Sequence, residues 1–316
     1  MAGALALATG VISALQSRAN GSLGVLLQQS LVAAAWSFVS GWVALSLIAL
    51  ARPQMRRGVL AAHRAYRAGR LPWWQFFGGL LGGAYVGTQA FSVPVVGVAL
   101  FSIASLGGQT VNALAVDRWG LGPAGAKPIS RLRLAAAALA VVGIIIAVGP
   151  RVGALTEGFV LACVLAFVTG AGLSLQAAIN GQVRTASGDA MTAAWINFSW
   201  GSVLLGGLVL GRLAAGALTW SWPTSLPVWA LLGGLLGVTN VALSTILVHR
   251  LGVLVLMLLG LAGQLVGALT IDLLVSDTRG FVGPQLLLGI VVTMVAAGAA
   301  AVAARRDAAR AGAVEG

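Results

Sequence analysis

Carboxamide side chains recur at a fixed spacing in a chain that has few other polar groups in its apolar stretches. The segment LQSRANG places Gln16 and Asn20 four residues apart, and LQAAING places Gln176 and Asn180 in the same way. Side chains at i and i+4 share one face of a helix. An amide both donates and accepts hydrogen bonds, so this face suits either a partner helix or a neutral or zwitterionic ligand.

A second glutamine pair lies in the middle of two other apolar stretches. Gln109 belongs to a polar stripe with Ser105 and Asn112, at i, i+4 and i+7, whereas the positions that flank Gln264 at the same spacing are glycines. Packing alone would keep two such stripes alike, whereas a ligand is not two-fold symmetric. We therefore expect Gln109, Asn112 and Gln264 to face a ligand pathway, with packing between helices as the alternative.

Tryptophan and aspartate supply the remaining candidate side chains. Trp36 and Trp195 lie deep in apolar segments and could line a cavity as aromatic walls. Asp117 and Asp272 each follow a charge-free stretch. They are either solvated helix ends, with Asp117 beside Arg118, or an ion or proton site near one mouth of a pathway.

The composition defines the environment of these side chains. Of the 316 residues, 59% are hydrophobic and only 8% are charged, which is far too few charges to cover a soluble surface. The net charge of +12 comes from arginines between apolar segments, without a nucleic-acid-binding motif. One cysteine and two distant histidines give no metal or cofactor spacing, and we expect no cofactor and no signal peptide.

The charge-free stretches predict ten transmembrane helices. A break is expected within residues 92–97, where SVPVVG interrupts a stretch too long for one helix. The expected spans are 3–19, 30–51, 73–93, 97–117, 132–149, 158–179, 190–211, 229–248, 252–273 and 284–304.

Lysine and arginine predict the orientation of these spans. With a cytoplasmic N-terminus, most of the 19 basic residues are cytoplasmic, and the exceptions are Arg18, Arg151, Arg212 and Arg279. Both termini are then expected in the cytoplasm. The arginine-rich loop within 52–72 is expected to fix this topology and to contact anionic lipids.

The two amide motifs belong to an internal repeat. TGVISALQSRANG at residue 9 aligns with TGAGLSLQAAING at residue 169, an offset of 160, and later motifs align at an offset of 155. The chain therefore divides into a first repeat over 1–151, a second over 152–304 and a cytoplasmic tail over 305–316. Because each repeat has five helices, the second enters the membrane inverted, which is a transporter architecture. With both repeats in one chain, a monomer could form the complete unit.

The ordered motifs also carry a family resemblance. LQAAING, the WWQFFGGLLGG segment at residue 73 and the Gly–Gln plus Asp pattern of the fourth helix resemble the YdcZ-like family of the drug/metabolite transporter superfamily, in a fused tandem form. The resemblance covers essentially the whole chain. It implies an all-α, EamA-like integral membrane fold in the bacterial inner membrane and an exporter of poorly defined substrates.

The leading functional hypothesis is a secondary transporter that works by alternating access. Its partners would be a small neutral or zwitterionic metabolite or drug and the membrane lipids, and not nucleic acid. Four glutamines would face the central site, with Gln109 and Gln264 deep and Gln16 and Gln176 nearer the rim. The alternatives are a non-transporting scaffold or lipid-handling subunit, or a membrane enzyme, for which no catalytic motif is present.

Overall fold

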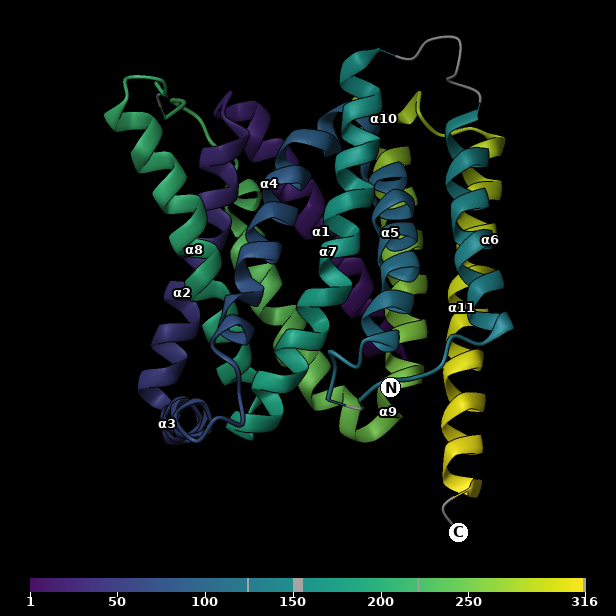
Figure 1. The fold of residues 1–316 in the computed structure, drawn as a ribbon. Helices are drawn as coiled ribbons and strands as arrows, with labels where there is room; N and C mark the ends of the chain where they lie inside the picture. Colours follow the sequence, from purple (N-terminus) through teal and green to yellow (C-terminus); the bar gives the residue numbers. More distant parts are fainter. Residues whose placement is uncertain (124, 150–155, 221, 315–316) are drawn as a thin grey trace.

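The structure is a computed structural model that describes residues 1–123, 125–149, 156–220 and 222–314. These residues form helices and connections, without a strand (Figure 1). The helices are α1 (Ala2–Leu26), α2 (Ser30–Ala51), α3 (Pro53–Arg67), η1 (Trp73–Phe77), α4 (Gly78–Val96), α5 (Val98–Arg118), α6 (Arg131–Val148), α7 (Glu157–Ser187), α8 (Ala190–Ala214), η3 (Val228–Leu232), α9 (Gly233–Leu274), α10 (Ser276–Arg279) and α11 (Pro284–Val314).

Eight helical segments of the described residues are long and apolar enough to span a membrane. Helices α1 and α4 have sufficient length but are not among these eight, because glycines and polar side chains reduce their hydropathy. The protein is therefore an all-helical, multi-pass membrane protein, and the count of ten spans in two repeats stays a prediction.

Two glycines break long helical runs at matching positions. Gly97 separates α4 from α5 with φ 84°, inside the predicted break, and Gly252 divides α9 with φ 73°. Such positive φ angles are strained for any residue with a Cβ atom. We call residues 233–251 the first arm of α9 and residues 253–274 its second arm.

The ends of two helices and one connection differ from the expectations. Helices α1 and α7 continue past Asn20 and Asn180, so the expected span ends at residues 19 and 179 are too early. Helix α7 ends instead at Ser187, and Gly188 caps it with φ 70°. The expected loop within 52–72 contains helix α3, whose buried positions recur on one face and pack it against α7 and α8.

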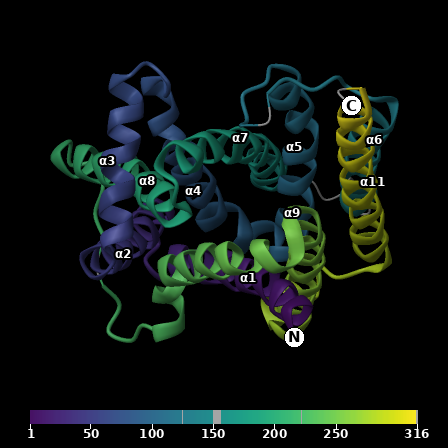
Figure 2. The same ribbon diagram turned by 90° about the horizontal axis from the view of Figure 1, so that it is seen from below.

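The long helices of the first half of the chain pack mainly against those of the second half (Figures 1 and 2). Helix α1 lies along α9, and α7 lies along α4 and α5. Helices α2 and α8 pack against each other at the side of the molecule away from α6 and α11 (Figure 1), and the rings of Phe38 and Phe198 meet at a tilt with centroids 5.1 Å apart. Each of these rings packs against a glycine of the other helix, Gly201 or Gly41, because any larger residue there would overlap the ring.

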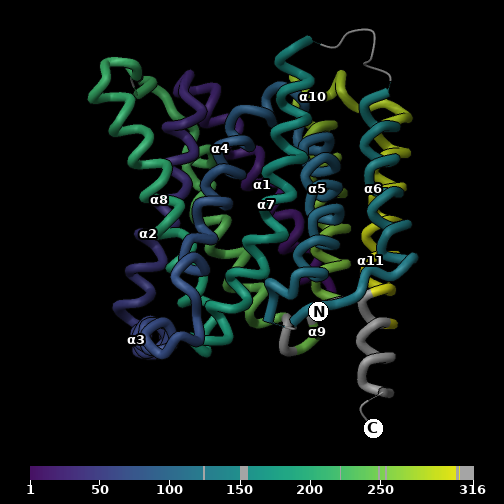
Figure 3. The backbone as a smooth tube through the Cα atoms, viewed as in Figure 1, coloured from purple at the N-terminus to yellow at the C-terminus, as the bar shows by residue number. Residues whose placement is uncertain are grey.

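Helices α6, α11 and α3 lie at the periphery of the molecule (Figure 1). Helices α6 and α11 pair at one edge, and α3 lies across the long helices at the end of the molecule where both chain termini also lie (Figures 1 and 3). The predicted boundary between repeats, at residues 151 and 152, and the predicted side of Arg151 fall outside the described residues. Helix α11 continues through the expected tail as far as Val314.

Candidate functional site

Glycines on α4 and α9 make room for the glutamines of the repeated motif. A Cβ atom at Gly82 would lie 2.7 Å from Nε2 of Gln176, and one at Gly237 would lie 2.9 Å from Nε2 of Gln16. Both glycines therefore let a polar side chain enter between helices whose sequences are otherwise apolar.

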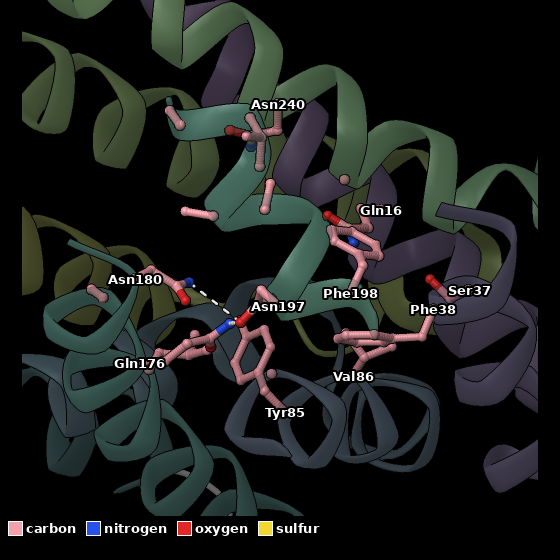
Figure 4. Close-up of a pocket in the computed structure, with 18 of the residues that line it drawn as sticks. Gln16, Ser37, Phe38, Tyr85, Val86, Gln176, Asn180, Asn197, Phe198 and Asn240 are labelled. Atoms are coloured by element: carbon pink, nitrogen blue, oxygen red, sulfur yellow. Dashed lines mark hydrogen bonds between the residues drawn. The ribbon is translucent and has the colours of Figure 1, made fainter. Parts of the chain in front are cut away.

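A cavity of about 630 Å³ lies where these helices meet (Figure 4). The volume is within the range of small-molecule sites. Its wall combines amides with the aromatic rings of Phe38, Tyr85 and Phe198. The polar lining residues are Gln16, Ser37, Tyr85, Gln89, Gln109, Gln176, Asn180, Arg184, Asn197 and Asn240. Among the described lining residues Arg184 alone carries a charge, so the wall offers hydrogen bonds and no carboxylate.

Hydrogen bonds fix the amides on the α7–α8 side of the cavity. Oδ1 of Asn197 accepts hydrogen bonds from Nε2 of Gln176 at 2.8 Å and from Nδ2 of Asn180 at 3.3 Å (Figure 4). Oε1 of Gln176 is buried and has no hydrogen-bond partner among the described residues. An unpaired buried acceptor costs free energy, so this oxygen favours a ligand that donates a hydrogen bond.

The opposite wall holds Asn240 in the first arm of α9. Its Nδ2 donates to the backbone oxygen of Thr9 at 3.0 Å and to Oγ of Ser13 at 2.5 Å, and its Oδ1 accepts from Ser244 at 3.2 Å. The bonds to Thr9 and Ser13 join α9 to α1 along this wall.

The cavity is closed at one end and reaches the surface at the other. At the closed end, Asn20 donates to Gln89 at 2.8 Å, and Gln89 donates to Ser17 at 2.8 Å. Asn20 and Ser17 are each only 1% exposed. At the other end the lining extends to the exposed side chain of Arg184 on α7.

Four of the predicted site residues line the cavity: Gln16, Gln109, Gln176 and Asn180. Asn20 does not, because it belongs to the closed end. Asn112 donates instead to the backbone oxygen of Ala171 and to Oγ of Ser174, both at 2.9 Å, and so joins α5 to α7. Gln264 is absent from the lining, contrary to the expectation that it lies deep in the cavity, since its helix packs backbone-to-backbone on α1 at Gly10.

The two predicted tryptophans also lie outside the main cavity. Nε1 of Trp36 donates to the backbone oxygen of Leu231 at 3.0 Å, and its ring contacts Trp222 edge-on. Nε1 of Trp195 donates to Oγ of Ser46 at 2.9 Å, and its ring lines a second, smaller cavity. Both hold neighbouring helices together.

The aspartates act on helix ends and not on the cavity. Asp272 is 1% exposed and accepts hydrogen bonds from the backbone N–H groups of Val98 at 3.0 Å and Ala99 at 2.7 Å. It therefore caps α5 across the molecule, and its reading as a solvated helix end is wrong. Asp117 pairs with Arg133 and not with Arg118.

Several lining residues were not predicted from the sequence. Ser37 and Asn197 occupy equivalent positions at the offset of 160, and Tyr85 and Asn240 do so at the offset of 155. All four are polar, but neither pair is identical, so a search for repeated identities does not find them. Repeated polarity of differing residue type is the signal that would have found them.

The helices and their central cavity define a polytopic membrane protein of the transporter kind. The family described as "Putative inner membrane exporter, YdcZ" matches the chain over residues 1–146 and 161–299. The chain therefore belongs to this family, the YdcZ-like family of the drug/metabolite transporter superfamily, whose description is that of a membrane transporter. No curated protein and no solved structure matches the chain significantly.

Proposed function

We propose that this protein exports a small neutral or zwitterionic solute by alternating access between two inverted five-helix repeats. The observation that carries the proposal is a polar cavity of about 630 Å³ that is closed at the Asn20 end and reaches the surface at the Arg184 end. The second segment matched by the family begins 160 residues after the first, at the offset of the amide motif, which supports the repeat.

The chemistry of the lining supports the substrate class. Gln16, Gln109 and Gln176 offer donors and acceptors, and no described carboxylate lines the cavity to balance a strong cation. A solute with both donors and acceptors would satisfy these amides, including the unpaired oxygen of Gln176. Aromatic rings would cover its apolar part.

The distribution of basic residues indicates which side of the membrane the open end of the cavity faces. Helix α3, rich in arginine, lies at the same end of the molecule as both termini (Figure 1). Its Gly58 packs against Ser187 in the last turn of α7, which also contains Arg184. Under the positive-inside rule that end is cytoplasmic, so the cavity would be open to the cytoplasm. In the opposite state, the repeat-equivalent Gln264 would line the cavity in place of Gln109.

The cavity also favours a transporter over the alternative of a non-transporting scaffold or lipid-handling subunit. A scaffold or lipid-handling subunit would use its amides for packing, with their polar groups bonded to one another and no cavity between them. Asn112 fits that description. Gln16 and Gln109 line the cavity instead, and Gln176 keeps an unpaired oxygen there although its nitrogen is bonded to Asn197.

The test begins with a thermal-shift screen of neutral and zwitterionic metabolites on the purified protein. The best ligand is then used for flux into proteoliposomes containing the wild type, Gln16→Leu, Gln109→Leu or the matched control Gln285→Leu on the exposed start of α11. We expect Gln16→Leu and Gln109→Leu to lower flux at least about tenfold, since each removes hydrogen bonds worth about 1.4 kcal/mol or more in the bound state, with little change in melting temperature. Normal flux in both variants would show that the cavity is not the transport site.

A further inference from the structure

A second cavity, of about 350 Å³, lies outside the helix bundle between α3, η1 and α8. Its wall consists of Val59 and His63 from α3, Phe76 from η1, and Trp195, Ile196, Ser199, Trp200 and Val203 from α8. The proposed transport pathway does not use it. The α8 part of the wall belongs to an apolar membrane-spanning segment, and Val203 at its far end is 61% exposed.

Most of the wall of this cavity is apolar, and two of its polar groups are bonded elsewhere in the protein. Nε1 of Trp195 is bonded to Ser46, and Oγ of Ser199 donates to the backbone oxygen of Trp195 at 2.8 Å. The other polar groups of the wall are the imidazole of the exposed His63 and the indole N–H of Trp200. This cavity, which we call the slot, is therefore a largely hydrophobic site beside the exposed Val203 of α8, which suits a hydrocarbon chain.

The entrance to the slot lies beside an amphipathic, arginine-rich helix. Helix α3 buries Met55, Gly58, Ala62 and Ala65, and the hydroxyl of Thr192 in α8 donates to the backbone oxygen of Met55 at 3.2 Å. The helix lies across the ends of the long helices, as interfacial helices do (Figure 2). Residues 53–67 include no aspartate or glutamate, so its positive charge is uncompensated within the helix.

Helical geometry divides the exposed arginines of α3 into two sets. At 100° per residue, Arg56 and Arg67 lie about 40–60° from the direction of Val59 and His63, which line the slot. Arg57 and Arg64 lie about 120–140° away, on the other side of the helix. Arg56 lies one turn before Val59 and Arg67 one turn after His63, so the first pair flanks the two ends of the slot wall, about 16 Å apart along the helix, and places positive charge at both ends. The second pair is a matched control.

We propose that this slot binds an acyl chain of an anionic phospholipid, with the negatively charged headgroup attracted by the flanking Arg56 and Arg67. The positive charge of α3 favours an anionic headgroup. The hydrophobic slot favours a lipid over a free phosphate, because only a lipid has an acyl chain to fill it. The site is independent of the transported solute. Because α3 packs against Ser187 and Thr192 at the α7–α8 turn, a bound lipid would also brace the helices at the open end of the main cavity.

The test titrates the detergent-purified full-length protein with phosphatidylglycerol or phosphatidylethanolamine of identical acyl chains and counts bound lipids by native mass spectrometry. The variants are Arg56→Gln/Arg67→Gln and the control Arg57→Gln/Arg64→Gln. At about 1 kcal/mol for each arginine, the first should weaken phosphatidylglycerol binding about 30-fold. The control should change it by less than about twofold.

A third variant, Ser199→Leu, fills the slot without changing a charge and should weaken phosphatidylglycerol binding at least about tenfold. It tests the acyl-chain contact even if the arginine variants fold poorly. Three outcomes overturn the proposal: equal binding of the two lipids by the wild type, equal loss in the two arginine variants, or full binding by Ser199→Leu. Melting temperatures identify any variant that has lost its fold.

Discussion

The two ends of the central cavity are built from repeat-equivalent residues, yet one is closed and the other is open. At the closed end α1 packs on α4, with Asn20 bonded to Gln89. At the open end the equivalent Asn180 lines the cavity, and no comparable packing joins α7 to α9 in the described part of the chain. The equivalent of Gly24, which approaches the backbone of α4, is the exposed Arg184.

This difference shows that one sequence motif has two uses in one molecule. The amide of Asn20 joins α1 to α4 at the buried, closed end, whereas that of Asn180 joins α7 to α8 and lines the open cavity. Two equivalent structures in different states are what an alternating device requires, because exchanging their states would close the open end and open the closed one.

The largest effect should come from the carboxylate that caps α5. Asp272→Ala removes two charge-assisted hydrogen bonds from buried N–H groups, so we expect the free energy of unfolding to fall by about 3 kcal/mol. Unfolding titrations in detergent, with the exposed Asp277→Ala as control, measure this loss. A loss for Asp272→Ala no larger than that for Asp277→Ala would contradict the assigned cap.

A smaller loss of stability is expected from a substitution at Gly24, where α1 and α4 lie in close contact at the closed end. A Cβ atom at Gly24 would lie 2.7 Å from the backbone oxygen of Ala90, so Gly24→Leu should separate α1 from α4 and cost about 2 kcal/mol. The control is Gly206→Leu on α8, where no atom lies within 4 Å of the added Cβ. Both variants gain the same helix propensity, so their difference reports the contact. Matching melting temperatures would mean that the closed end tolerates separation.

The sequence predicted much of the helical arrangement, because apolar stretches bounded by charges have few alternatives in a membrane. The break at Gly97 and the starts of α2 and α8 are confirmed. The length of α7 was underestimated because Asn180 and Gly181 look like a helix end. Helix α3 was predicted to be a loop because its many arginines suggested a solvated connection. The helical spacing of its small and apolar residues, which would have indicated an amphipathic helix, was not considered.

The cavity could be predicted only in part, for a reason that lies in the repeat itself. A repeat identifies equivalent positions but not which copy is closed, so Asn20 and Gln264 were grouped with Asn180 and Gln109. The hydrogen bonds that Asp272 accepts from the start of α5 likewise join segments about 170 residues apart in the sequence. No local sequence pattern reveals such a contact.

The most direct test of the account compares the accessibility of the two equivalent asparagines. Asn20→Cys and Asn180→Cys are made separately with Cys163 replaced by alanine, and vesicles of each orientation are treated with a membrane-impermeant maleimide. We expect Asn180→Cys to react from the side of α3 at least about tenfold faster than Asn20→Cys reacts from either side. Equal labelling at the two positions, or labelling of Asn180→Cys only from the side opposite α3, would contradict it.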